Sequence, residues 1–125
     1  MSFEKLIVFQ KSYELAMEIF QATKQFPKEE AYALTDQLRR SSRSVCANIA
    51  EGYRKRVYPK VFVAKMLDSD GECSETIVHL MFAKDCGYIS PDSFLDFRSR
   101  YEEIGKILGS LIRHPDTLIN YKQGI

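Results

Sequence analysis

The chain has 125 residues, 45% of them hydrophobic, and its 18 basic and 17 acidic residues leave a net charge of +1. This length supplies apolar side chains for one core and is too short for two, so we expect one domain over residues 1–119. No apolar run approaches the roughly 20 residues that span a bilayer, and the apolar run after Glu4 and Lys5 has only four residues, so we expect no secretory signal, which would need a longer uncharged core.

Two helices are predicted in the first half of the chain. Apolar residues recur at three- and four-residue steps over 6–25, which predicts a helix that ends at Phe26-Pro27. Thr35 is a potential N-cap, and an apolar stripe with serine and alanine beside it continues to about Arg54. We therefore expect a second helix over 35–54.

Two further helices are predicted in the second half. Pro59 suits a first helical position, and the apolar pattern continues to Gly87, a residue typical of a helix end. Ser90 followed by proline predicts the cap of a fourth helix, which Pro115 bounds. Short connections between four helices indicate an all-α, antiparallel up-down four-helix bundle, and residues 120–125 are expected to form a frayed polar tail.

The near-neutral net charge hides a strong asymmetry. Residues 36–60 contain seven basic and two acidic residues, a balance of +5, whereas residues 61–105 contain four basic and nine acidic residues, a balance of −5. Such a pattern indicates either an RNA-facing surface or charged regions that dock on each other or on a neighbouring subunit. Both explanations stay open at the level of sequence.

The second and third helices flank a turn near Val57 and Tyr58, so a hairpin folded there predicts which residues face each other. With about one helical turn of uncertainty, residues whose numbers add to 115 should lie opposite each other. The predicted pairs are Arg40 with Glu75, Arg43 with Glu72, and Ser44 with Gly71. Two charge pairs and one close contact between small residues would thus hold the helices together.

Basic and aromatic residues mix at the same turn. Tyrosine rings stack on unpaired bases, while lysine and arginine neutralise phosphates, so this mixture is typical of nucleic-acid contact. The same composition also occurs in an ordinary solvated turn. The candidate nucleic-acid-binding residues are Tyr53, Arg54, Lys55, Arg56, Tyr58 and Lys60.

Catalytic and metal-binding motifs are absent from the sequence. It contains no phosphate-binding glycine loop, no H-E-x-x-H and no G-x-S-x-G. Glu75 and His79 have the spacing of an exposed helical pair, and the cysteines at 46, 73 and 86 form no C-x-x-C motif. We therefore expect no metal, no cofactor and no enzymatic activity, and the three thiols suit a reducing cytoplasm.

Several of these segments together resemble the four-helix-bundle protein family, also called the 23S rRNA intervening-sequence proteins. The likeness covers nearly the whole chain and is most specific in and around the second helix. It is carried by Gln37-Leu38-Arg39-Arg40, Ser44, Asn48-Ile49-Ala50-Glu51-Gly52, Gly71, Glu75 and Gly87-Tyr88-Ile89. The resemblance implies that Arg40, Ser44, Asn48, Glu51, Gly52, Gly71 and Glu75 form a structural motif.

The resemblance also implies a way of working. Members of the family look like left-handed bundles that assemble as ring-shaped homopentamers, and some are encoded within insertions of large-subunit ribosomal RNA genes. A related accessory protein of diversity-generating retroelements is a basic pentamer that binds nucleic acid and a reverse transcriptase. We therefore expect a homopentameric scaffold that associates with RNA, with a protein-binding adaptor, for example for a reverse transcriptase, as the alternative.

Overall fold

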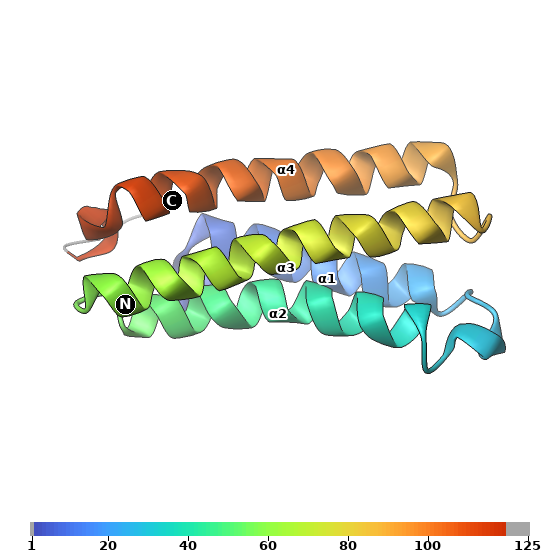
Figure 1. The fold of residues 1–125 in the computed structure, drawn as a ribbon, viewed down its shortest axis with the longest axis horizontal. Helices are drawn as coiled ribbons and strands as arrows, with labels where there is room; N and C mark the ends of the chain where they lie inside the picture. The colour runs from blue at the N-terminus through green and yellow to red at the C-terminus, as the bar shows by residue number, and fades with distance from the viewer. Residues whose placement is uncertain (1, 120–125) are drawn as a thin grey trace.

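The computed structural model describes residues 2–119 and confirms the all-α four-helix bundle (Figure 1). Consecutive helices run in opposite directions, and the described residues contain no strand. The main helices are α1 (Ile7–Thr23), α2 (Leu34–Arg54), α3 (Pro59–Asp85) and α4 (Pro91–Arg113), with short 3-10 turns η1 (Phe3–Lys5), η2 (Lys28–Glu30) and η3 (Pro115–Leu118). The tail predicted over residues 120–125 lies outside the described residues.

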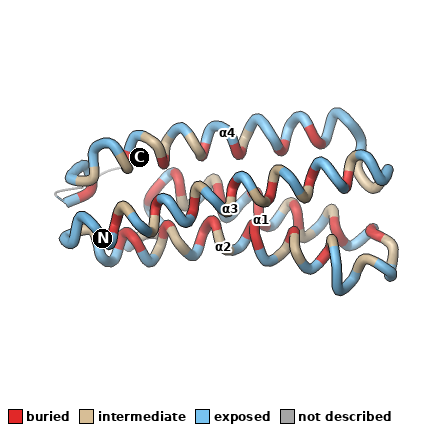
Figure 2. Tube along the Cα trace, in the orientation of Figure 1, coloured by how far each residue is buried: buried red, intermediate tan, exposed pale blue. Residues whose placement is uncertain are grey.

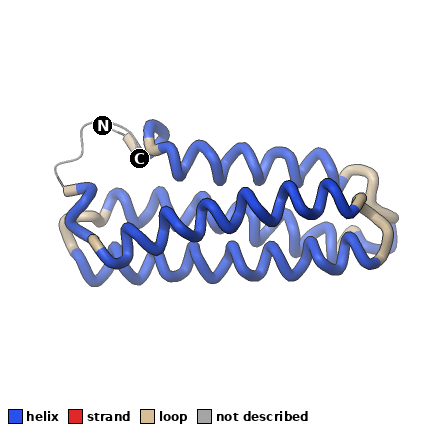
Figure 3. The backbone as a smooth tube through the Cα atoms, turned by 90° about the horizontal axis from the view of Figure 1, so that it is seen from above, coloured by secondary structure: helices blue, strands red, loops and turns tan. Residues whose placement is uncertain are grey.

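Each long helix packs against the two helices next to it around the bundle (Figures 1 and 3). At one end, the turn between α2 and α3 lies near η1 and η3, which pack against α1 and α2 and against α3 and α4, respectively. The connections from α1 to α2 and from α3 to α4 lie at the opposite end. The basic turn between α2 and α3 is therefore at one end of a long bundle.

Local sequence explains most of the helix boundaries. The Ser90 hydroxyl accepts a 3.0 Å hydrogen bond from the Ser93 amide and confirms the predicted cap of α4. Gly87 adopts a φ of 79°, which closes α3 in the left-handed conformation that glycine tolerates. The cap predicted at Thr35 is wrong, because α2 begins one residue earlier and Thr35 is buried.

Buried side chains line the inward face of every long helix (Figure 2). The core is largely aliphatic and also contains the rings of Phe26, Tyr53, Phe62, Phe94, Phe97 and Tyr101. Its largest fully buried members are Leu6, Leu15, Ile19, Leu38, Ile49, Phe62, Met66, Leu80, Tyr101, Ile104, Leu108 and Leu118. The predicted amphipathic stripes thus form one continuous core.

Small residues bring α2 and α3 close together. The buried Ser69 hydroxyl donates a 2.9 Å hydrogen bond to the carbonyl oxygen of Val45, and the hydroxyls of Ser41 and Thr76 are hydrogen-bonded at 2.8 Å. Gly52 packs against α3 so tightly that a Cβ atom there would lie 3.0 Å from the Lys65 Cβ atom. Buried hydroxyls need such partners, so these contacts fix both the height and the rotation of α3 against α2.

The predicted hairpin register is correct in its main pair. Arg40 forms ion pairs with Glu75 at 2.6 Å and with Glu72 at 3.3 Å. Arg43 does not face Glu72, because it lies on the α1 side of α2 with its guanidinium 5.8 Å from the ring centroid of Phe20. The rule that opposing residues have numbers adding to 115 predicts which residues lie at the same height along the two helices. It does not predict how each helix is rotated about its own axis.

Gly71 shows the same distinction. The predicted close contact between Gly71 and Ser44 is wrong, since nothing lies within 4 Å of a Cβ atom built at Gly71. Ser69 faces α2, and two further residues rotate the helix by about 200°, which turns Gly71 to the outside. Gly52 takes the role of the close contact instead.

We predict that Arg40 and Glu75 are energetically coupled. Charge reversal by Arg40→Glu should destabilise the protein by about 1 kcal/mol or less, because both side chains are partly exposed. Adding Glu75→Arg should recover part of this loss in chemical denaturation experiments. Strictly additive effects of the two changes would contradict a direct pair.

We also predict that Gly52 cannot carry a side chain without cost. Gly52→Ala should lower the free energy of unfolding by about 1–3 kcal/mol, because the new methyl group would clash with Met66 Cε. Gly109→Ala is the matched control, since its methyl group would meet only the flexible end of Arg113 at 3.3 Å. Thermal melting of both variants should give a lower midpoint for the first alone.

Candidate nucleic-acid interface

The predicted basic cluster is exposed where the chain reverses between α2 and α3. Arg54 ends α2, Lys55 follows it, and Lys60 lies in the first turn of α3. The Tyr58 amide donates a 2.8 Å hydrogen bond to the Lys55 carbonyl oxygen, which closes the turn and leaves the Tyr58 side chain 60% exposed. Three cations and one accessible ring are thus gathered at the end of the bundle, as predicted.

Two members of the predicted cluster have a structural role instead. Tyr53 is only 2% exposed and belongs to the core, so the base-stacking contact predicted for its ring is wrong. The Arg56 guanidinium lies 4.1 Å from the Tyr53 ring centroid and donates a 3.0 Å hydrogen bond to the Tyr53 carbonyl oxygen. Tyr53 is one helical turn from Ile49, a core residue, and this spacing is the sequence signal for its burial.

The other residues of the predicted motif mainly support α2 and its contact with α3. The Asn48 amide donates hydrogen bonds of 2.9 and 3.1 Å to the carbonyl and hydroxyl oxygens of Ser44. Glu51 pairs with Lys65 at 2.7 Å, and the hydrogen bond from Arg40 lowers the pKa of Glu75. These contacts involve partly exposed residues beside the buried interface.

Ion pairs neutralise many of the acids of α3 and α4 but few of the bases of α2. Glu72 and Glu75 pair with Arg40, while Asp96 and Glu102 pair with arginines of their own helix. Within residues 2–119, the cations that form no ion pair on α2, the turn after it and the first turn of α3 are Arg39, Arg43, Arg54, Lys55, Arg56 and Lys60. The positive half of the charge asymmetry therefore persists in the folded chain.

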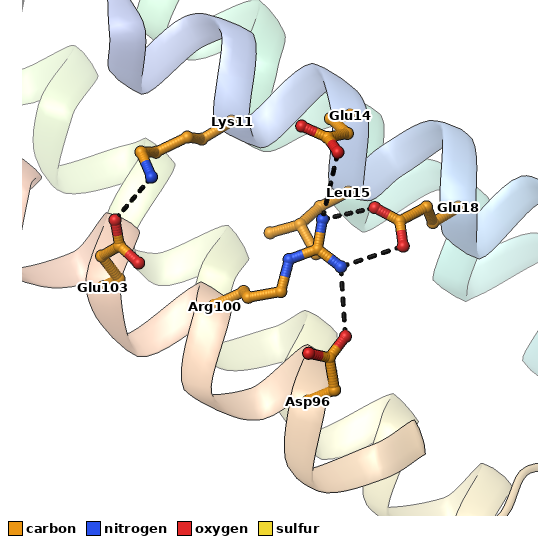
Figure 4. Close-up of a pocket in the computed structure, with 7 residues that line it drawn as sticks. All are labelled: Lys11, Glu14, Leu15, Glu18, Asp96, Arg100 and Glu103. Atoms are coloured by element: carbon orange, nitrogen blue, oxygen red, sulfur yellow. Dashed lines mark hydrogen bonds and ion pairs between the residues drawn. The ribbon is translucent and has the colours of Figure 1, made fainter. Parts of the chain in front are cut away.

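A polar hollow of about 340 Å³ lies between α1 and α4 (Figure 4). Arg100 reaches across it to Glu18, with which it forms two hydrogen bonds, and also pairs with Asp96 at 3.1 Å. Lys11 and Glu103 pair at 2.7 Å beside this cluster. Both cations that line the hollow are engaged in ion pairs with its four acids, so we assign it to the linkage of α1 and α4 rather than to ligand binding.

Sequence reasoning missed this linkage because Glu18 and Arg100 are 82 residues apart. The hydrogen bonds that Arg100 donates to the Glu18 carboxylate raise the pKa of Arg100, and the guanidinium stays charged at any ordinary pH. Nothing short of the tertiary arrangement brings these two positions together.

A second hollow, of about 430 Å³, lies between α1 and α2 and is mainly apolar. Arg43 is the only charged residue in its lining. The other lining residues are Phe3, Phe9, Tyr13, Ala16, Met17, Cys46, Ala47 and Ala50. This groove is open on the surface, and sequence reasoning did not find it because its two walls are more than 20 residues apart.

The outer face of α3 carries an uncharged stripe that is not used in the bundle. Its members recur with alternating steps of three and four residues, the pattern by which helices pair. They are Ala64, Leu67, Gly71, Ser74, Val78 and Met81, and all six are exposed. We call these six residues the α3 seam.

The described residues offer little for metal or thiol chemistry. No three histidine, cysteine or acidic side chains converge on a possible metal position among them. Burial raises the pKa of Cys46, and it raises that of Cys73 to about 12, so both thiols are protonated at neutral pH.

Within residues 2–119, no helix combines the length and the apolarity that crossing a bilayer requires.

Comparisons with known proteins agree with the fold and with the resemblance to the family. The chain is similar to a crystal structure of a protein of unknown function from the S23 ribosomal protein family of Bacteroides thetaiotaomicron, with 27% identity and a TM-score of 0.77. The match covers 86% of this chain and 99% of that one. No curated protein gives a significant match. The sequence pattern of one family matches residues 4–110, and the chain therefore belongs to the 23S rRNA-intervening sequence protein family.

Proposed function

We propose that this protein is a non-enzymatic scaffold that assembles into a ring of identical subunits and associates with RNA. The α3 seam is the observation that carries the self-association. A helix already packed on one face has no structural reason to carry a second uncharged stripe over about two and a half heptad repeats unless that stripe is covered.

A second copy of the chain is the occupant that fits the seam best. Its centre consists of Gly71 and Ser74, which let another helix approach closely, and larger Leu67 and Val78 flank this centre. Gly71 has nothing within 4 Å of its Cβ position in the single chain, so there is room for a partner. If the seam packs against a different face of the next copy, the contacts propagate and close into a ring.

The number of copies and the RNA partner rest on the family. The resemblance to ring-shaped homopentamers implies five subunits, and the family is named after an insertion in 23S rRNA. The exposed Arg54, Lys55 and Lys60 supply the positive charge that RNA phosphates require. In a ring, this cluster would recur around one rim and strengthen weak contacts through avidity.

We predict that the seam is needed for assembly. Light scattering of the parent protein should give about five times the 14.5 kDa chain mass. Leu67→Glu combined with Val78→Glu should reduce this mass towards that of one chain, because buried carboxylates in a helix pair are costly. Tyr32→Glu, at a position 99% exposed outside the long helices, is the control and should leave the mass unchanged. A monomeric parent at micromolar concentration would disprove the ring.

We predict that the basic end contributes salt-dependent RNA binding. The parent should retain structured RNA on filters at low salt, and Arg54→Gln, Lys55→Gln and Lys60→Gln together should reduce the slope of log affinity against log salt by about 2 to 3. Arg56 is left intact in this variant because it covers Tyr53. Absence of RNA binding by the parent would favour a protein-binding adaptor, such as one for a reverse transcriptase.

A further inference from the structure

Three cationic side chains surround one aromatic ring on the face shared by α1 and α2. Lys24 Nζ lies 4.9 Å from the ring centroid of Phe20, and the guanidinium carbons of Arg39 and Arg43 lie 4.6 and 5.8 Å from it. Because each charge lies within 5.8 Å of the same ring centroid, any two of them are separated by at most twice that distance. Arg39 is held in place by a 2.8 Å hydrogen bond from its Nε to the Thr23 hydroxyl.

These three charges have no partners of opposite sign. Among residues 2–119, no carboxylate forms an ion pair with Lys24, Arg39 or Arg43, whereas Arg40 on the same helix pairs with two acids. Lys24 and Arg43 are exposed. Mutual repulsion of three such cations is relieved when an anion binds among them, so the cluster fits a phosphate group.

The cluster continues directly into the apolar groove between α1 and α2. Arg43 belongs both to the cluster and to the groove lining. Along the floor of the groove, Tyr13 is 55% exposed and its ring lies 5.9 Å from that of Phe9, which in turn lies 5.0 Å from Phe3. An accessible ring thus lines the same groove as Arg43.

The same face ends at the basic turn. Arg39, Arg43, Ala47, Ala50 and Arg54 follow one another on α2 at steps of four, four, three and four residues and so share one side of the helix. The stretch from 39 to 54 spans about 22 Å at about 1.5 Å per residue. Cations therefore stand at both ends of a groove whose middle is aromatic and aliphatic.

We propose that the α1–α2 face binds a single-stranded segment of RNA. Phosphates would contact Lys24, Arg39 and Arg43 at one end and Arg54 at the other, while a base stacks on Tyr13. This inference rests on the proposed RNA association and extends it, because it names the form of RNA and a surface outside the basic turn.

The shape and chemistry of the face favour an unpaired strand. A base can reach Tyr13 only if it is not already stacked and paired within a duplex, and proteins that bind single strands combine a positive groove with such rings. Its length suits a short segment, because about 22 Å corresponds to at most about six nucleotides at the 3.4 Å rise of a stacked strand.

The test is fluorescence anisotropy of the whole protein with a labelled single-stranded oligouridine of about 12 nucleotides, at low salt and across a salt series. Lys24→Gln with Arg43→Gln should weaken binding by about tenfold or more. It should also reduce the slope of log affinity against log salt by about 1.4, since each of the two lost phosphate contacts on a single strand contributes about 0.7. Tyr13→Ala should weaken binding about fivefold or more, and Tyr13→Phe, which keeps the ring, should not.

The matched charge control is Lys106→Gln with Arg113→Gln, which removes two exposed, unpaired cations from α4. It should change the affinity little. A loss as large as that of the Lys24/Arg43 variant, or equal binding of a duplex of the same length, would overturn the proposal. So would a change of oligomer mass in the Lys24/Arg43 variant, because the face would then be a contact between subunits.

The same experiment distinguishes a failure of the proposed RNA association from a failure of the single-strand site on the α1–α2 face. If the parent binds no RNA at low salt, the proposed RNA association fails and this inference fails with it. If the parent binds, and the variant at Arg54, Lys55 and Lys60 weakens binding while changes at Lys24, Arg43 and Tyr13 have no effect, only the single-strand site is wrong.

Discussion

The close packing of α2 against α3 determines where every other surface of this bundle points. Ser69 and Thr76 place their hydroxyls against α2, and Gly52 admits α3 at a distance that a larger residue would prevent. With the rotation of α3 fixed in this way, its acids meet Arg40 and its seam faces outward. The other side of α2 stays available to form a groove with α1.

The electrostatics follow from this geometry. The acids of α3 and α4 find many of their partners within the chain, through Arg40 between α2 and α3 and through Arg100 between α1 and α4. The cations on the opposite side of α2 form no ion pair among the described residues, whereas Glu14 and Glu18, the acids of α1, pair with Arg100. A molecule with almost no net charge thus presents a positive face, and the field of that face rather than the total charge governs its attraction to an anionic partner.

The proposed function depends on surfaces rather than on a reactive centre. The thiols of Cys46 and Cys73 are buried and protonated, and the charged side chains around Arg100 are held to one another by ion pairs. What remains is an uncharged seam, a basic turn and an open groove. These are features by which subunits assemble and extended partners bind, and repetition in a ring would multiply contacts that are individually weak.

Sequence alone determined the four helices and their order, because periodicity, caps and turn residues act over a few positions. It also determined the pairing of Arg40 with Glu75, because the short turn between α2 and α3 fixes which residues of the two helices lie at the same height along the bundle. It could not place Gly71 outside, since a shift of one residue rotates a helical side chain by about 100° and burial depends on which neighbour occupies that direction. For Tyr53 the spacing from Ile49 was a usable signal of burial, and the basic residues around it concealed that signal. The groove beside Tyr13 and the cations around Phe20 likewise required the tertiary structure. They join residues of α1 and α2 that become neighbours only when the two helices pack, and no local pattern records that contact.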